Sequence, residues 1–191
     1  HLRLGAVLAL AFAASSAGAH MATGEVMKAP GSRVAIDLPR NYEVSRLFHG
    51  FILRAASISV VLFEVPGGAF PKLAEGLTPA ALEGKRIKNA RKADLGRGDE
   101  HLYLVGEQES NRGTIIKHIL LIRNKDHAAL ITANVPKASI DGGLISKDEI
   151  PKALATAVVQ NERAPSNDPY KLGYLGRFKE AGPLRASAKL Y

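Results

Sequence analysis

The chain has 191 residues, of which 46% are hydrophobic and 23% charged, with a formal net charge of +8. This length is enough for one domain with a hydrophobic core. The sequence contains no cysteine, which excludes disulfide bonds, thiolate catalysis and cysteine-ligated zinc or iron–sulfur sites. The basic charge favours acidic partners such as anionic lipid headgroups or acidic proteins, although many exported proteins without such partners are basic too.

The first 19 residues have the three-part pattern of a secretory signal peptide. Arg3 supplies a positive charge, residues 4–14 form an uninterrupted apolar run, and Ala17-Gly18-Ala19 matches a small-residue cleavage site. The apolar run has only about half of the roughly 20 residues that span a bilayer, which argues against a transmembrane anchor. We therefore predict an exported, periplasmic protein whose mature chain begins at His20. The alternative is an apolar helix packed in the core.

Three strands are predicted after a Gly- and Pro-containing lead-in that we interpret as flexible. The lead-in covers residues 20–33, and the strands cover residues 34–38, 47–53 and 57–65. Apolar and polar residues alternate in the first strand, and the third is rich in β-branched residues. Residues 70–84 have helical spacing instead, and we predict one helix with a break near Gly76 or two short helices. Thr78-Pro79 is a typical helix start.

Four more strands are predicted in the second half of the chain. They cover residues 87–93, 101–109, 114–123 and 128–135. The connections between the last three are short and turn-rich, which implies antiparallel hairpins. The strand at 114–123 is apolar on both faces, so we expect it to be central and covered on both sides. Leu120 and Ile131 are expected to be buried on adjacent strands.

The C-terminal part is predicted to contain a helix, a linker and an extension. The helix begins at about residue 147 or 149 and ends near residue 159. Ser146 with Glu149 matches a capping box, although Pro151 fits better if the helix starts at Asp148. Residues 161–169 are polar and are interpreted as a linker. Residues 170–191 form a C-terminal extension that stops inside a strand-like pattern, as a truncated sequence would.

Two stretches, together with the order of the elements, resemble a known fold family. One is the run from Val34 to Tyr42, in which Leu38-Pro39 is followed by a turn and an aromatic residue, and the other is the helix start from Gly76 to Leu82. They are similar to the corresponding parts of PsbP-like superfamily proteins. The similarity is greatest to the small exported bacterial members of the DcrB type. The resemblance implies an α+β fold over residues 34–160, with a central antiparallel sheet of about six to seven strands flanked by helices in an α/β/α sandwich. It brings no catalytic residues and implies a role in binding larger assemblies.

A cluster of basic residues is the most local candidate for a binding site. Its members are Lys85, Arg86, Lys88, Arg91 and Lys92, with Arg97 close behind. The cluster fits contact with an anionic surface, either a membrane or an acidic protein. It also fits a solvated edge strand whose charges prevent pairing with other chains. No aromatic residues are interleaved, which argues against nucleic-acid binding.

The remaining polar residues do not form a recognisable catalytic or metal-binding motif. No histidine pair has metal-ligand spacing, and His118, between Ile116 and Leu120, is expected to be a satisfied core residue. No serine lies in a known nucleophile motif. We therefore expect no cofactor, no metal and no catalysis. The leading hypothesis is a non-catalytic accessory or interaction domain of the bacterial envelope, acting on a protein or other envelope component. The alternatives are a periplasmic carrier of an apolar small molecule, held between sheet and helix, and an enzyme with an unrecognised site.

Overall fold

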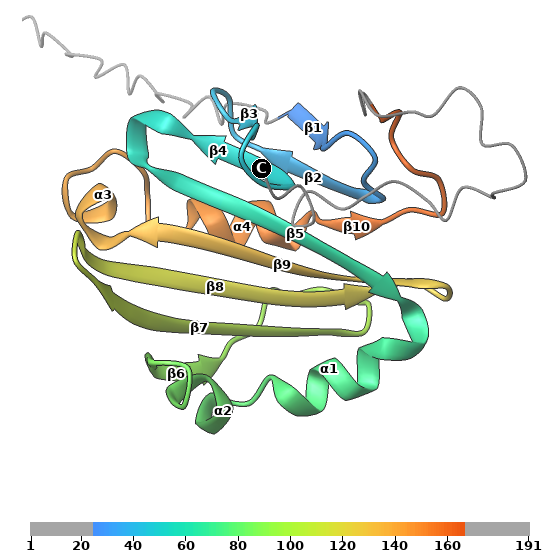
Figure 1. Ribbon diagram of the computed structural model, residues 1–191. Coiled ribbons are helices and arrows are strands. Elements are labelled where there is room, and N and C mark those ends of the chain that lie inside the picture. Colours follow the sequence, from blue (N-terminus) through green and yellow to red (C-terminus); the bar gives the residue numbers. More distant parts are fainter. Residues whose placement is uncertain (1–24, 167–191) are drawn as a thin grey trace, which may run out of the picture.

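The computed structural model describes residues 25–166, and its centre is a seven-stranded antiparallel sheet (Figure 1). The strand order is β3-β4-β5-β9-β8-β7-β6. The strands are β3 (Glu43–Val44), β4 (Gly50–Leu53), β5 (Ile58–Pro66), β6 (Ile87–Lys92), β7 (His101–Ser110), β8 (Gly113–Arg123) and β9 (His127–Pro136). The α+β fold and the size of the central sheet agree with the expectation from the sequence.

A second, three-stranded sheet joins the two ends of the described chain. Its order is β1-β2-β10, with β1 (Glu25–Lys28), β2 (Val34–Leu38) and β10 (Val158–Val159). The strand at 34–38 is therefore outside the central sheet, and the short β3 lies at the sheet edge instead. Residues 25–28 pair with β2 although we expect a flexible lead-in there, and Met27 packs against the core.

In the described part of the chain, six short helical segments flank the strands. They are η1 (Arg54–Ala56), η2 (Gly67–Ala69), α1 (Phe70–Gly76), α2 (Pro79–Glu83), α3 (Lys137–Asp141) and α4 (Glu149–Ala155). The predicted break near Gly76 is confirmed, and the Ala81 N–H donates to Thr78 Oγ1 over 3.2 Å as a helix cap. The prediction for the last helix was too long, because α4 ends at Ala155. No side-chain cap forms at the start of α4, so the predicted capping box is wrong.

The core has two parts, one on each face of the central sheet. On one face, the sheet packs against β2, α3 and α4, while α1 and α2 lie against β6, β7 and β8 on the other. Leu120 and Ile131 are directly opposite each other on β8 and β9 and are fully buried in the first part. Ile119 and Leu121 belong to the second part. The prediction that this strand is central and covered on both sides is confirmed.

Glycine is required where β4 meets β5. Gly50 has φ +143°, and a Cβ atom there would lie 2.0 Å from the Val60 carbonyl oxygen. Any side chain would therefore push β4 away from its partner strand.

Residues 161–166 run beside the segment that precedes β2. The Ala164 N–H donates to the Ser32 carbonyl over 2.7 Å, and the Gly31 N–H donates to the Ala164 carbonyl over 3.1 Å. The first part of the predicted linker is thus fixed by backbone hydrogen bonds. The predicted signal peptide, the start of the lead-in, the end of the linker and the extension at 170–191 lie outside the described residues. Within residues 25–166, no helix has the length and apolar character needed to cross a membrane.

Candidate functional site

The predicted basic cluster lies at the β6 edge of the central sheet. All five side chains are exposed, with Lys85 and Arg86 in the turn before β6. A bulge in β6 places Lys88 opposite Glu107 and Arg91 opposite Val105, so both lie on the same face.

Lys92, opposite Leu104, lies on the other face of β6. The cluster is therefore divided between a turn and two faces. It does not form one flat cationic patch.

Arg97 is separate from this cluster and has a structural role. Its side chain is 6% exposed and donates to the carbonyl oxygens of Leu154, over 3.2 Å, and Ala155, over 2.8 Å, at the end of α4. Its Nε also donates to Asp99 over 2.8 Å, and this hydrogen bond is the main reason that the pKa of Asp99 is lowered. Arg97 therefore satisfies the free carbonyls at a helix C-terminus.

His118 forms a buried pair with Tyr103. The Tyr103 hydroxyl lies 2.6 Å from His118 Nδ1, and the two rings stack with centroids 6.1 Å apart. Burial, with a smaller effect of the Arg91 charge, lowers the pKa of His118 to about 4, while burial raises the pKa of Tyr103 to about 12. Both groups are therefore neutral near pH 7, which confirms that His118 is a satisfied core residue.

The other histidine on this pair of strands does not join His118. His101 is opposite Ile122, and its Nδ1 lies 2.9 Å from the Asp99 carbonyl oxygen. Across residues 25–166, no group of three or more His, Asp or Glu side chains could hold a metal ion.

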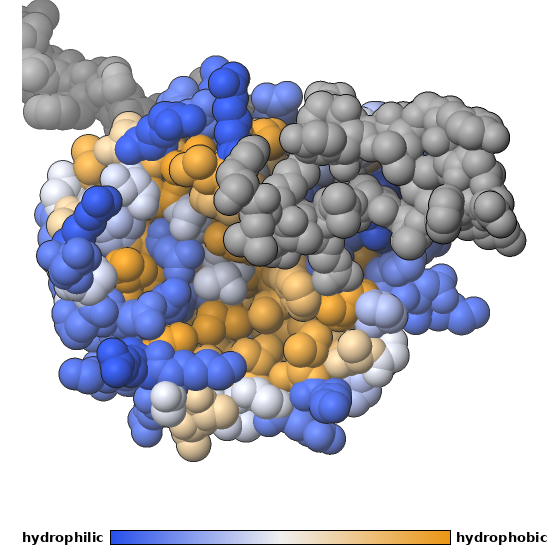
Figure 2. Space-filling view, in the orientation of Figure 1, coloured by the Kyte–Doolittle hydropathy of each residue, from blue (hydrophilic) through white to orange (hydrophobic). Residues whose placement is uncertain are grey.

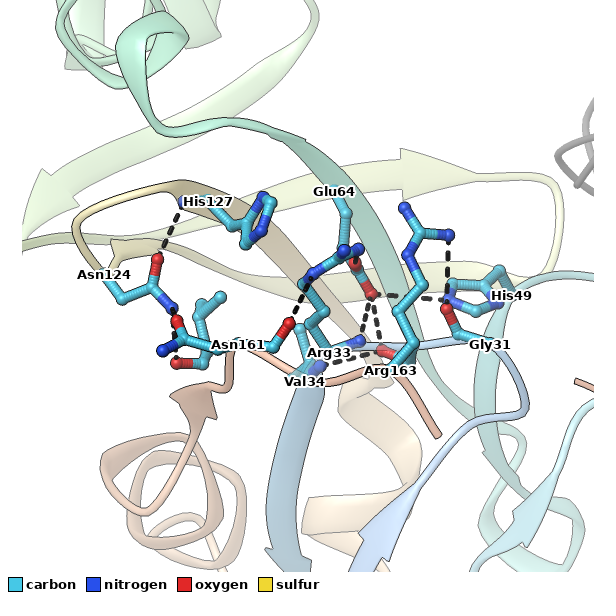
Figure 3. A network of polar contacts seen from close by, with 11 residues as sticks. Gly31, Arg33, Val34, His49, Glu64, Asn124, His127, Asn161 and Arg163 are labelled. Atoms are coloured by element: carbon cyan, nitrogen blue, oxygen red, sulfur yellow. Dashed lines mark hydrogen bonds and ion pairs between the residues drawn. The ribbon is translucent and has the colours of Figure 1, made fainter. Parts of the chain in front are cut away.

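Glu64 is the centre of a polar network at the start of β2 (Figure 3). Its Oε1 accepts from the Ser32 hydroxyl over 2.6 Å and from the Arg33 N–H over 2.9 Å, and His49 Nε2 lies 3.8 Å away. Burial favours the protonated form, but the interactions with His49, Ser32, Arg33 and Arg163 outweigh it and lower the pKa of Glu64 to about 2.

Asn124 forms the second half of this network in the turn between β8 and β9 (Figure 3). Its Nδ2 donates to the Val159 carbonyl and to Asn161 Oδ1, each over 3.0 Å, while its Oδ1 accepts from the His127 N–H over 2.7 Å. Together with Glu64, it holds β2 and residues 159–163 against the central sheet. We assign a structural role to the whole network.

One face of β5 and β9 is covered incompletely by the rest of the domain. Along these strands, residues that face β2 and α4 are buried, while alternate residues such as Val61, Leu130 and Thr132 are only partly buried. The short helices α1 and α2 lie mainly against β6 and β8, and their apolar cluster reaches Ala128 and the side of Leu130 on β9 but does not include Val61 or Thr132. Apolar side chains accordingly gather across the centre of the view in Figure 2, bordered by hydrophilic residues. We call this surface the open face.

A row of polar side chains crosses the open face. Lys117 Nζ donates to Asn134 Oδ1 over 2.7 Å, and Asn134 Nδ2 donates to Ser59 Oγ over 2.9 Å. Burial lowers the pKa of Lys117. The sequence analysis missed this row, because the three residues meet only through the register of β8, β9 and β5. The available signal was a polar residue within a largely apolar stretch of each of the three strands.

Comparisons with known proteins give similarities in fold at low identity. No family model and no curated protein matches the chain. A Bacteroides thetaiotaomicron structure is 14% identical with a TM-score of 0.49, and the match covers 73% of this chain and 50% of that chain. LpqN, described as involved in cell envelope biogenesis of Mycobacterium tuberculosis, is 13% identical with a TM-score of 0.44 and coverages of 74% and 87%.

PsbP (CyanoP) from Synechocystis is 11% identical with a TM-score of 0.44, and the match covers 76% of this chain and 97% of that chain. It belongs to the family that the sequence pattern resembles. The chain spans half the length of the Bacteroides protein. At these identities and TM-scores, the similarities assign neither an activity nor a partner to this chain.

Proposed function

We propose that this chain is an exported, non-catalytic accessory domain of the bacterial envelope that binds an apolar partner on its open face. The observation that carries the proposal is the alternation along β5 and β9. Val61 and Leu130 are only partly buried, Leu130 at the margin of the cluster under α1 and α2, whereas their neighbours Leu62 and Ile131 are buried. A fully covered sheet would bury both sets, so the exposed parts of these apolar side chains are available to a partner.

The polar groups of the domain support a binding role over catalysis. The Tyr103–His118 pair is buried and neutral, and Glu64 is held as a carboxylate by neighbours that join β2 to the sheet. The Tyr103–His118 pair and Glu64 therefore stabilise the fold. Export is supported by the charge at Arg3, the apolar run at 4–14 and the Ala17-Gly18-Ala19 cleavage pattern.

A second candidate within this proposal is a periplasmic carrier of a small apolar molecule. The row formed by Lys117, Asn134 and Ser59 favours this candidate, because it adds a single charged group to an otherwise apolar surface. Ligand sites commonly combine an apolar lining with a few polar groups that orient the ligand.

Binding on the open face can be tested with the neutral apolar dye Nile red. The variant Leu130→Gln places an amide on the open face, and Val26→Gln makes the same kind of change on β1, where Val26 is 66% exposed. We expect Leu130→Gln to weaken dye binding several-fold and Val26→Gln to leave it unchanged, with both variants folded by circular dichroism. Equal dye binding by parent and Leu130→Gln would contradict the proposal.

Export is tested separately by expressing the full gene in a Gram-negative host. We expect periplasmic protein whose N-terminal sequence begins at His20. An uncleaved protein in the cytoplasmic fraction would contradict this part of the proposal.

A further inference from the structure

Lys117 lies in an unusual environment for a lysine. It is half-buried in the central strand β8, between Ile115 and Ile119 on the same face, with Gly106 beside it on β7. Lysine is rarely buried without a charged partner, because removing an ammonium group from water is costly. Among residues 25–166, Lys117 has no carboxylate within ion-pair distance, and its hydrogen-bond partner is the neutral side chain of Asn134.

The ammonium group therefore retains hydrogen-bonding capacity. A lysine ammonium carries three N–H donors, and Asn134 accepts one of them over 2.7 Å. Asn134 is itself fixed by its bond to Ser59. The ammonium is thus held in one position, and two of its donors have no acceptor among residues 25–166, so that they can serve water or a ligand. A carboxylate or a phosphate oxygen would supply both the acceptor and the opposite charge.

Apolar rows extend from this charge along the open face. Thr132 and Leu130 follow Asn134 on β9, and Val61 lies opposite Thr132 on β5. From Asn134 to Leu130 the strand rises about 13 Å, at roughly 3.3 Å per residue. Leu73 of α1 packs against the same apolar cluster as Leu130. The surface is therefore a strip with one charge at one end and apolar side chains along its length.

We propose that Lys117 binds the anionic head group of a single-chain amphiphile whose tail lies over Thr132, Leu130 and Val61. The inference rests on the proposed function and names the ligand class of the open face. A single fixed cation matches a single carboxylate or phosphate. A polyanion would require several cations along its path, and the basic cluster at β6 is divided between two faces.

The test compares dodecanoate with dodecanol, which has the same tail and a neutral head, by isothermal titration calorimetry. We expect the parent protein to bind dodecanoate about tenfold more tightly, which corresponds to about 1.4 kcal/mol, because the carboxylate accepts a charge-assisted hydrogen bond that the neutral hydroxyl cannot match. Lys117→Met keeps the apolar stem and removes the charge. It should lose the preference for dodecanoate and still bind dodecanol within about twofold of the parent. Lys152→Met, on the exposed side of α4, is the matched control and should behave like the parent.

The outcomes separate this inference from the proposed function. If Lys117→Met keeps the preference for dodecanoate, the head-group site is overturned, while sensitivity of dodecanol binding to Leu130→Gln would still support an apolar site on the open face. If neither compound binds the parent, the amphiphile is overturned as the ligand, and a protein partner becomes the alternative. If dodecanol binding is unaffected by Leu130→Gln, the open face itself is the wrong site.

Discussion

The hydroxyl of Tyr103 and the ring of His118 share a hydrogen bond of 2.6 Å inside the core, although they lie on different strands and Tyr103 is directly opposite Leu120. The diagonal contact lets each polar group satisfy the other without water. Tyr42 is a useful contrast. Its hydroxyl is also buried but has no hydrogen-bond partner among residues 25–166, and burial, with the negative charge of Glu149, raises its pKa.

These two tyrosines give a matched pair of hydroxyl deletions. Tyr103→Phe leaves His118 Nδ1 without its partner, so we expect the free energy of unfolding to fall by about 1–3 kcal/mol. Tyr42→Phe removes a buried hydroxyl that has no partner in the described part of the chain, and should leave the stability unchanged or slightly increased. Urea unfolding of both variants is the measurement. A larger loss for Tyr42→Phe than for Tyr103→Phe would refute the assignment.

The stability of the domain should decrease in mild acid because of His118. Its pKa is about 4 in the folded protein and about 6.5 when unfolded, so the unfolded chain takes up a proton first as the pH falls. The stabilisation is complete above pH 6.5 and is lost between pH 6.5 and 4, by up to about 3 kcal/mol. His118→Gln should be less stable at pH 7 but should have a flatter pH dependence in this window. A slope identical to that of the parent would show that another group titrates there.

Glu64 should dominate the response to stronger acid. Its folded pKa of about 2 lies below the ordinary value of 4.5, so its stabilisation is present above pH 4.5 and is lost as the pH falls towards 2. We expect Glu64→Gln to cost about 1–3 kcal/mol at neutral pH, because two short hydrogen bonds lose their charged acceptor.

The control for Glu64 is Glu43→Gln, which removes an exposed carboxylate paired with Arg54. Exposed ion pairs contribute roughly 0–1 kcal/mol. Thermal unfolding should therefore separate the two variants clearly, and equal melting temperatures would mean that the Glu64 network does not hold β2 to the sheet.

The role of the basic cluster remains a prediction with two interpretations, contact with an anionic surface or a solvated edge strand. Because the bulge in β6 divides the charges between two faces, we expect the variant Arg86→Gln/Lys88→Gln/Lys92→Gln to sediment with anionic liposomes as the parent does. The experiment is run at low and moderate salt, since contact with an anionic surface would be screened by salt. A large loss of binding that depends on salt would establish the cluster as a docking site instead.

Local sequence patterns were sufficient for most elements of the fold. The alternation along β8 predicted both of its buried faces, and Gly76 with Thr78 predicted the interrupted helix. Long-range pairing was not predictable in the same way. Residues 34–38 are strand-like, but nothing local indicates that they leave the central sheet and pair with Val158 and Val159. β1 was missed because three of its four residues are exposed, so its burial does not alternate.

The polar row on the open face illustrates the same limit for function. Ser59, Lys117 and Asn134 are far apart in the sequence and belong to no motif. They become neighbours only because Asn134 is opposite Ser59 on one side and Lys117 on the other. The basic cluster was found because its residues are close together in the sequence, and that proximity says nothing about which way each side chain points.

The pairing of β10 with β2 has a consequence for how the chain acquires its fold. Val158 lies opposite Ala35, so a strand near the start of the domain is completed by one near its end. Such a contact closes nearly the whole domain into one loop, and closing long loops is entropically slow. The hairpins of the central sheet can form as they are synthesised, but the three-stranded sheet must wait for the last segment. A chain interrupted anywhere before β10 would therefore keep β2 unpaired on that side and its apolar side chains without their full cover.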